Sequence, residues 1–364
     1  MQRSNRGLRR LTRTAVVVLL AVGAVACSSN EDTRGTPATT QAPTTTAPPT
    51  APATAPAAAF PVTIAHAFGE TTIEQEPHRI VALGDGSQDV VAALGLTPVG
   101  IPTGYPGSNA DGVLPWYASS FDAATTTLLP VFDGIPFEQI AALHPDVILA
   151  PYAGFDESDY KTLSAIAPTV AYPGDPWVTP WPTQTRMIGE ALGRSAEADA
   201  LIAGVDTTLA GAAAAHPELA GLTFAYLYTD ATSAWVFLPA DARVELVSDL
   251  GLRPSDMVIA LSADNPGAFT VELSPERLAD IDADVLIVEQ SDGPADISRV
   301  ALADRIPAVQ RGAVVVYGTE DAALSVALIP TVLSIPYAAQ RLATDLAAAL
   351  ARATPTAATP TTAG

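Results

Sequence analysis

Apolar and polar positions follow their most regular pattern between residues 183 and 216 of the 364-residue chain. After Ser195, apolar residues recur at helical spacing with polar residues between them, namely Leu201, Ile202, Val205 and Leu209. Gly193 interrupts the pattern, and Pro217 ends it because a residue before proline is disfavoured in a helix. A helix of about 20 residues is roughly 30 Å long, as wide as a small domain. We therefore predict that residues 183–216 form one rigid bridging helix between two folded lobes.

Short apolar runs alternate with helical patterns on both sides of this bridge. Buried strands are predicted at residues 79–83, 98–101, 147–150, 168–172, 222–228, 234–238, 284–289 and 313–317. The alternation predicts an α/β fold with an N-terminal lobe over residues 60–182 and a C-terminal lobe over residues 217–350. In open α/β sheets, ligands bind beyond the carboxyl ends of the strands, so the aromatic-rich loops that follow the strands are candidate ligand contacts.

The amino terminus has the pattern of an export signal. Five arginines precede an apolar run from Ala15 to Ala26 that is too short to span a membrane comfortably, which predicts a signal peptide over residues 1–26. Cys27, the single cysteine, follows small residues, and this arrangement resembles the bacterial lipoprotein box, in which the cysteine is lipidated. The alternative is ordinary cleavage after Ala26, with Cys27 incidental. Residues 27–59 and 351–364 are rich in Thr, Pro and Ala, which predicts a flexible tether and a disordered tail.

Composition excludes several classes of function. The formal net charge of −21 makes the chain a poor candidate for binding nucleic acid, and an anionic ligand would need a local arginine or aromatic site. One cysteine allows no disulfide within the chain, and the four histidines lack the spacing of a helical metal pair. The glycines around Asp85 lack the third glycine and the lysine of a phosphate loop. A surface hydrolase using Asp85 and Asp89 as paired carboxylates stays a distant alternative, since no G-x-S-x-G elbow is present.

An internal repeat relates the two predicted lobes. Residues 136–148, PFEQIAALHPDVI, match residues 274–286, SPERLADIDADVL, without a gap. Each segment predicts a short helix with an acid in its first turn, followed by a buried strand that begins Asp-Val. The acids are Glu138 and Glu276, and helix-dipole stabilisation alone would account for either one. Their equivalent placement in two lobes favours a second role as paired surface anchors for a two-fold partner with matching cations.

The ordered set of these segments resembles the solute-binding lipoproteins of ferric-siderophore ABC importers, a group that includes vitamin B12 and haem binders. The resemblance covers roughly residues 60–350 and rests on PHRIVAL, PFEQIAALHPDVIL, LSAIAPTV, IGEALG and ELSPERLADIDADVLIVE. It implies two Rossmann-like lobes joined by a single long backbone helix, and a shallow cleft between them. It also implies a monomer without catalytic activity, held by a lipid on the outer face of the cytoplasmic membrane, with Glu138 and Glu276 docking onto permease arginines.

The resemblance further implies that aromatic and arginine side chains on cleft loops hold a chelate that already encloses its iron. The candidates here are Tyr105, Trp116, Tyr152, Trp177, Trp235 and Arg243. Core or loop packing is the alternative for each of them, and it is favoured for Trp235, which lies in a strand pattern. Because cations are scarce, we expect a neutral hydroxamate or mixed siderophore rather than a strongly anionic catecholate or citrate complex. No direct metal ligand and no cofactor is expected. Haem or cobalamin on the same fold is the alternative ligand.

Overall fold

A computed structural model of the chain describes residues 60–230 and 233–353. The predicted signal peptide, Cys27, the tether and most of the predicted tail lie outside these ranges. The N-terminal lobe opens with an antiparallel hairpin and continues as a five-stranded parallel sheet in the order β5-β4-β3-β6-β7. The strands of this lobe are β1 (Val62–His66), β2 (Gly69–Ile73), β3 (Ile80–Ala82), β4 (Gly100–Thr103), β5 (Thr127–Pro130), β6 (Val147–Leu149) and β7 (Thr169–Val170). Its helices are α1 (Ser87–Ala93), α2 (Phe137–Ala142) and α3 (Glu157–Ile166).

The C-terminal lobe contains a mixed sheet in the order β11-β9-β8-β12-β13, with β10 also paired to β8. Its strands are β8 (Thr223–Thr229), β9 (Ala234–Phe237), β10 (Arg253–Pro254), β11 (Thr270–Leu273), β12 (Val285–Gln290) and β13 (Val314–Tyr317). Its helices are α6 (Ala242–Asp249), α7 (Asp256–Asp264), α8 (Pro307–Arg311), α9 (Ala322–Ala327) and α10 (Ser334–Arg352). Strands β8, β12 and β13 are parallel, so their carboxyl ends share one edge, whereas β9 and β11 are antiparallel neighbours. The predicted α/β fold with two lobes is confirmed.

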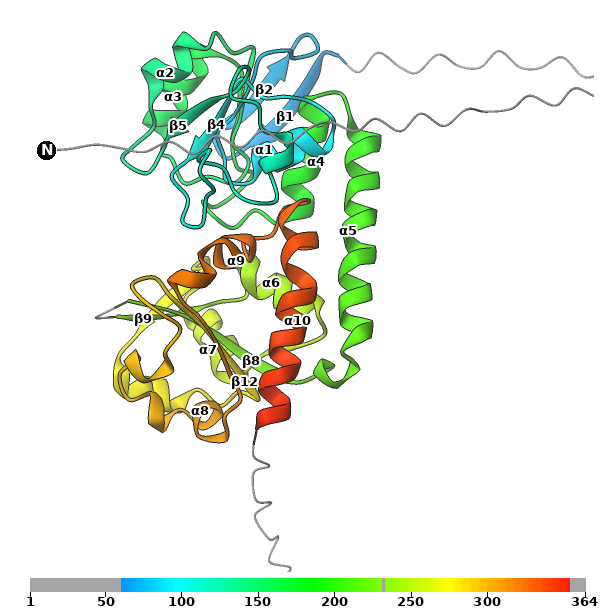
Figure 1. The fold of residues 1–364 in the computed structure, drawn as a ribbon. Coiled ribbons are helices and arrows are strands. Elements are labelled where there is room, and N and C mark those ends of the chain that lie inside the picture. The colour runs from blue at the N-terminus through cyan, green and yellow to red at the C-terminus, as the bar shows by residue number, and fades with distance from the viewer. Residues whose placement is uncertain (1–59, 231–232, 354–364) are drawn as a thin grey trace, which may run out of the picture. The chain divides into compact units, whose positions relative to one another are not determined.

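The stretch predicted as a single bridge is divided into two helices, α4 (Trp181–Ala191) and α5 (Ser195–Ala215). α4 packs against α1 and β1 of the N-terminal lobe, whereas α5 packs against α4, α6 and α10 and runs alongside both lobes (Figure 1). The two helices approach closely at Gly189, where an added Cβ would lie 2.3 Å from the Cβ of Ala198. Glycine, which has no Cβ, permits this approach. The bridging helix is therefore α5 alone, and the turn around Gly193 reverses the chain rather than bending one long helix.

Successive side chains of each strand point to opposite faces of its sheet, so the apolar core is divided into layers. One core runs from the inner face of the N-terminal sheet through α4, α5 and α10 to the inner face of the C-terminal sheet. The outer face of the N-terminal sheet forms a second core, and the outer face of the C-terminal sheet forms a third. Strands covered on both faces are expected in parallel sheets and explain their nearly continuous apolar sequences. The continuous inner core is one reason to expect the lobes to keep their separation.

Candidate functional site

The carboxyl ends of β4 and β5 supply one aromatic wall of the site. Tyr105 follows β4, and its hydroxyl donates a short hydrogen bond to the carboxylate of Asp85, which follows β3. The Tyr105 ring lies edge-on to Phe132, with 5.2 Å between ring centroids, and 64 % of Phe132 is exposed. Burial raises the pKa of Asp85, while the hydrogen bond from Tyr105 acts in the opposite direction. The carboxylate therefore fixes the tyrosine ring beside an exposed aromatic surface.

Tyr152 and Trp177 form a second aromatic pair beyond β6 and β7. Their ring centroids are 5.7 Å apart, with Tyr152 buried and 37 % of Trp177 exposed. The backbone of Trp177 has φ of 63°, a conformation that is uncommon for a residue other than glycine. Gly154 allows the indole to lie against the backbone, since a Cβ there would be 1.9 Å from Nε1 of Trp177. The sequence thus includes a glycine where this tryptophan requires space.

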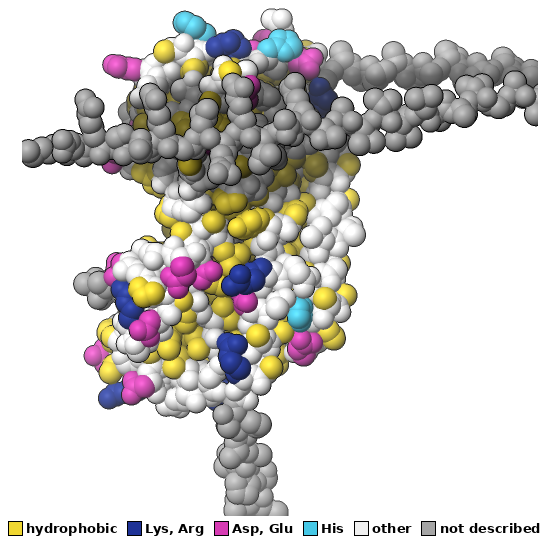
Figure 2. Space-filling model, viewed as in Figure 1, with side chains coloured by type: hydrophobic (Ala, Val, Ile, Leu, Met, Phe, Trp, Pro, Cys, Tyr) yellow, Lys and Arg dark blue, Asp and Glu magenta, His cyan; other side chains and the backbone are white. Residues whose placement is uncertain are grey.

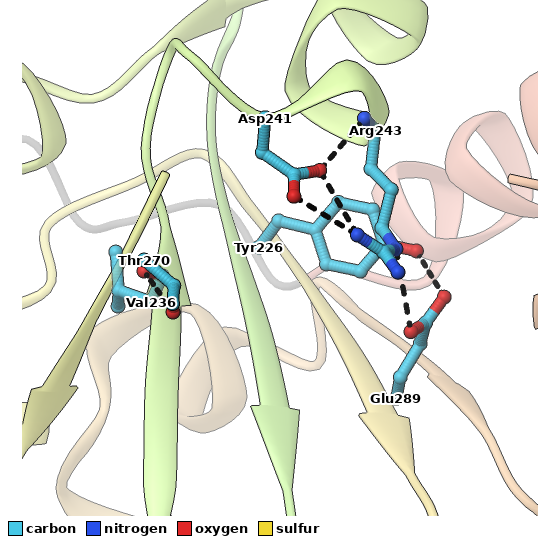
Figure 3. A network of polar contacts seen from close by, with 6 residues as sticks. All are labelled: Tyr226, Val236, Asp241, Arg243, Thr270 and Glu289. Atoms are coloured by element: carbon cyan, nitrogen blue, oxygen red, sulfur yellow. Dashed lines mark hydrogen bonds and ion pairs between the residues drawn. The ribbon is translucent and has the colours of Figure 1, made fainter. Parts of the chain in front are cut away.

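Arg243 faces these aromatics from the first turn of α6. Asp241 caps that helix by accepting a hydrogen bond of 2.8 Å from the backbone N–H of Arg243, and it also accepts bonds of 2.9 and 3.1 Å from the guanidinium (Figure 3). A weaker ion pair of 3.9 Å joins Arg243 to Glu289, and the guanidinium lies 4.4 Å above the ring of Phe237. Tyr226 donates a hydrogen bond of 2.5 Å to the other oxygen of Glu289. One arginine is therefore held by carboxylates from two directions.

In this cluster, burial disfavours the charged form of each side chain, whereas ion pairing favours it. The side chains of Asp241 and Glu289 are only 1 % and 7 % exposed, and that of Arg243 is 17 % exposed. Burial raises the pKa of both carboxyl groups, although the nearby guanidinium acts in the opposite direction. Burial disfavours the charge of Arg243 as well, but the carboxylates outweigh it and keep the arginine pKa above its usual range. Removing the arginine would leave both carboxylates buried without a counter-charge.

Two cavities lie between the lobes on either side of this cluster. The first, the Arg243 cavity, has a volume of about 210 Å³ and is lined by Pro106 of the N-terminal lobe together with Tyr228, Arg243, Glu289 and residues of α9. The second, the Glu245 cavity, has a volume of about 560 Å³ and is lined from both lobes. A further cavity of about 470 Å³ draws its lining from the C-terminal lobe alone and includes Arg299. We place the candidate site at the inter-lobe cavities because the conserved geometry of α/β sheets puts ligands at strand carboxyl ends.

Of the residues predicted to contact ligand, Arg243 lines one of these cavities, whereas the aromatic candidates line neither, namely Tyr105, Trp116, Tyr152, Trp177 and Trp235. Tyr105, Tyr152, Trp177 and Arg243 lie at the carboxyl ends of strands or at the start of α6, and the electrostatic influence of Arg243 reaches both Asp85 and Tyr152. Trp235 pairs with Tyr228 across β8 and β9, at 5.7 Å between ring centroids, so it supports the Arg243 cavity from behind a lining residue. This position agrees with the packing role that the strand pattern favoured for Trp235, and its contact with ligand stays a prediction.

Trp116 joins the lobes instead. Its Nε1 donates a hydrogen bond of 2.8 Å to Asp89, and its ring lies 5.3 Å from that of Tyr337 in α10. Thr331 of the C-terminal lobe donates a second bond, 2.5 Å long, to the same carboxylate oxygen. Burial raises the pKa of Asp89 to about 6. Trp116 is not among the lining residues of either inter-lobe cavity.

Several residues of the site were missed by reasoning from the sequence, among them Phe132, Tyr228, Asp241 and Glu289. Phe132 follows β5, a strand that is not among those predicted from the sequence. Glu289 lies within the apolar strand β12, where its charge alone could have signalled a functional position. None of the four histidines lines either inter-lobe cavity.

The predicted docking acids both lie on exposed surface. Glu138 is in the first turn of α2, and Glu276 is in the first turn of a 3₁₀ helix, Pro275–Asp280, so each acid begins a short helix as the repeat predicted. Hydrogen bonds from its own backbone N–H and from Ser274 lower the pKa of Glu276. Docking of these two acids onto a permease stays a prediction.

Figure 2 shows hydrophobic side chains gathered between the two lobes, while acidic and basic side chains are scattered over the outer surface. Within residues 60–230 and 233–353, no group of three or more His, Cys, Asp or Glu side chains is placed to hold a metal ion. No helix in the same ranges is long and apolar enough to cross a bilayer.

Comparison with known proteins agrees with this geometry. The family described as periplasmic binding protein matches residues 80–320. A probable siderophore-binding lipoprotein of Bacillus subtilis, YfiY, is 25% identical over 227 residues, which cover 62% of this chain and 67% of that protein. Streptococcus pneumoniae PiaA, solved in complex with ferrichrome, is 32% identical with a TM-score of 0.73, covering 80% of this chain and 99% of that one. A periplasmic solute binding protein of Mycobacterium smegmatis is 31% identical with a TM-score of 0.65, covering 79% and 98%. With this match along most of the described lobes, the chain belongs to the periplasmic binding protein family.

Proposed function

We propose that this protein captures a ferric siderophore between its lobes and delivers it to the permease of an ABC importer. The observation that carries the proposal is a cavity between the lobes that is lined by Arg243, together with aromatic side chains at the carboxyl ends of nearby strands, of which Tyr152 lies within the electrostatic influence of Arg243. Aromatic faces and one cation suit a chelate whose iron is already enclosed. The names of YfiY and of the PiaA complex support the same class of ligand.

The charges of the site favour a chelate that is neutral or positive. Among the residues that the structure describes, Arg243 is the one basic side chain lining the two inter-lobe cavities, and it lies near the carboxyl groups of Asp85, Asp241 and Glu289. A trianionic tris-catecholate would therefore be repelled both locally and by the net charge of −21. We expect a ferric hydroxamate, bound without chemical change.

A fluorescence titration tests the capture step. Trp177 is partly exposed beside the site, so a bound ferric hydroxamate should quench tryptophan emission and raise the melting temperature. Ferrichrome is the first probe, the iron-free chelator is its control, and a ferric tris-catecholate is the expected non-binder. Haem belongs in the same panel, where a shifted Soret band would favour the alternative ligand. Absence of quenching and of thermal stabilisation by every hydroxamate would refute the proposal.

The delivery step rests on Glu138 and Glu276, which are exposed and equivalent in the two halves of the repeat. Replacing both by Lys should leave ligand affinity unchanged and abolish siderophore-dependent uptake in cells, because like charges would then face the permease. A matched control reverses two other exposed acids, Glu190 and Asp264, and should preserve uptake. Normal uptake by the Glu138→Lys, Glu276→Lys variant would rule out the docking role.

We also propose that the protein is exported and held at the outer face of the cytoplasmic membrane by a lipid on Cys27. The support is the arginine-rich apolar leader and the position of the single cysteine. Intact mass of the protein purified from membranes should include a diacylglyceryl group, and Cys27→Ala should release the protein from the membrane fraction. An unmodified mature chain that begins at Cys27 would contradict the anchor.

A further inference from the structure

The Glu245 cavity is built differently from the Arg243 cavity beside it. Its volume is about 560 Å³, and both lobes contribute to its walls. Most of its lining side chains are apolar, namely Val178, Pro180, Pro239, Ala240, Ala242, Val244, Pro254 and Ile259. Ile259 is 49 % exposed at this wall, so the apolar surface is open to solvent rather than sealed into the core. A chain of methylene groups is the chemistry that such walls favour.

Both cavities have α6 as part of their walls. Ala242, Glu245 and Ser248 are spaced three residues apart and line the Glu245 cavity, because residues at that spacing share one side of a helix. Arg243 lies between the first two in sequence and lines the other cavity. Side chains two residues apart, such as Arg243 and Glu245, project from opposite sides of a helix, but the successive first-turn residues Ala242 and Arg243 line one cavity each, so both cavities reach the N-terminal end of α6. An arm that passes this end of the helix would lead from a chelate held at Arg243 into the Glu245 cavity.

Two polar groups in this cavity have no partner of their own. Within residues 60–230 and 233–353, Glu245 makes no ion pair, although it is partly buried, and burial followed by the charge of Asp249 raises its pKa. Thr179, from the N-terminal lobe, is 3 % exposed, and its hydroxyl has no hydrogen-bond partner among the described residues. In this otherwise apolar cavity, the oxygens of a carboxylate and of a hydroxyl have no hydrogen-bond donor among the residues that the structure describes. A positively charged donor would satisfy them.

We propose that the Glu245 cavity receives an aliphatic arm of the chelate that ends in a protonated amine. The methylene groups pack on the apolar walls, and the ammonium group pairs with the Glu245 carboxylate. This inference rests on the proposed function, since it names the kind of ferric hydroxamate that the same site selects. A cationic arm also agrees with the acidic surroundings of Arg243 and with the net charge of the chain.

Three ferric trihydroxamates separate the arm from the chelate. Desferrioxamine B has an arm ending in a primary ammonium group, its N-acetylated derivative has the same arm without the charge, and cyclic ferrioxamine E has no arm. Dissociation constants from tryptophan fluorescence should show the ammonium complex binding about fivefold more tightly than the acetylated one, as a partly desolvated ion pair gives. Glu245→Gln should make the two linear complexes equal and leave ferrioxamine E unchanged. Ile259→Lys, a change at an exposed wall position, should also remove the preference.

Glu190→Gln is the matched control, because this exposed glutamate lies on α4 and lines neither cavity. It should keep the full preference for the ammonium complex. Equal affinities of the two linear complexes for the unaltered protein, with ferrioxamine E still bound, would overturn the inference and leave the proposed function standing. Tighter binding of the acetylated arm would overturn it in favour of a purely apolar arm. Failure of all hydroxamates, ferrichrome included, would overturn the proposed function itself.

Discussion

Replacing Arg243 with Met tests the electrostatic account of the site most directly. The change keeps an unbranched apolar stem above Phe237 and removes the guanidinium, which pairs with Asp241 at 2.9 Å and with Glu289 at 3.9 Å. Both carboxylates are then buried without a counter-charge. Loss of one partner from a buried ion pair costs about 3–5 kcal/mol. We therefore expect the free energy of unfolding to fall by about 4 kcal/mol near neutral pH, measured by urea denaturation at fixed protein concentration.

The loss of stability caused by Arg243→Met should depend on pH. Burial already raises the pKa of Asp241 and Glu289 in the folded protein, and removing the arginine removes the main opposing influence. A carboxyl group whose folded pKa exceeds its unfolded pKa costs stability at high pH, and the cost disappears as pH falls through the folded pKa. The deficit of Arg243→Met should therefore be largest near about pH 8 and shrink toward about pH 5.

Two further variants isolate the cause. Adding Asp241→Asn and Glu289→Gln to Arg243→Met should restore most of the lost stability, because no buried charge then lacks a partner. Arg186→Met, at a 3.1 Å pair with Asp199 whose side chains are 57% and 64% exposed, should cost less than about 1 kcal/mol. A deficit for Arg243→Met below about 1 kcal/mol, or one that does not change with pH, would refute the reasoning.

Two glycines give the remaining predictions, each with a matched control. Gly154→Ala should displace the indole of Trp177, weaken chelate binding and alter tryptophan emission. Gly174→Ala, with no atom within 4 Å of the added Cβ, should leave affinity and emission unchanged. Unaltered affinity and emission in the Gly154→Ala variant would disprove the contact. Gly107→Ala should destabilise the protein by about 1–3 kcal/mol more than Gly221→Ala in urea denaturation. Both residues have φ of 78°, but only at Gly107 would the new Cβ meet the first turn of α9, at 2.2 Å from a backbone nitrogen. Equal losses would show that backbone strain alone is responsible.

Elements whose side chains repeat with a clear period were predictable from the sequence. The strands at the centre of each sheet, such as β6 and β12, are apolar because both of their faces are covered, and the long helix α5 has an apolar stripe at helical spacing. Strand β5 was missed, because its four residues, TLLP, include a proline at a sheet edge and show no alternation. The extent of the bridge was overestimated, since helical periodicity does not show that the chain reverses between α4 and α5.

The sequence by itself determined the local elements, the acidic charge, the repeat that relates Glu138 to Glu276, and the family resemblance, because each of these is written in neighbouring residues or in composition. Only the tertiary structure decided which side chains meet. Arg243 lies 46 residues before Glu289 in the sequence, and Asp89 lies 242 residues before Thr331, so no local pattern could join them. Their contacts depend on how the sheets stack against α5 and α10, which is settled by packing of the whole core rather than by any segment of it.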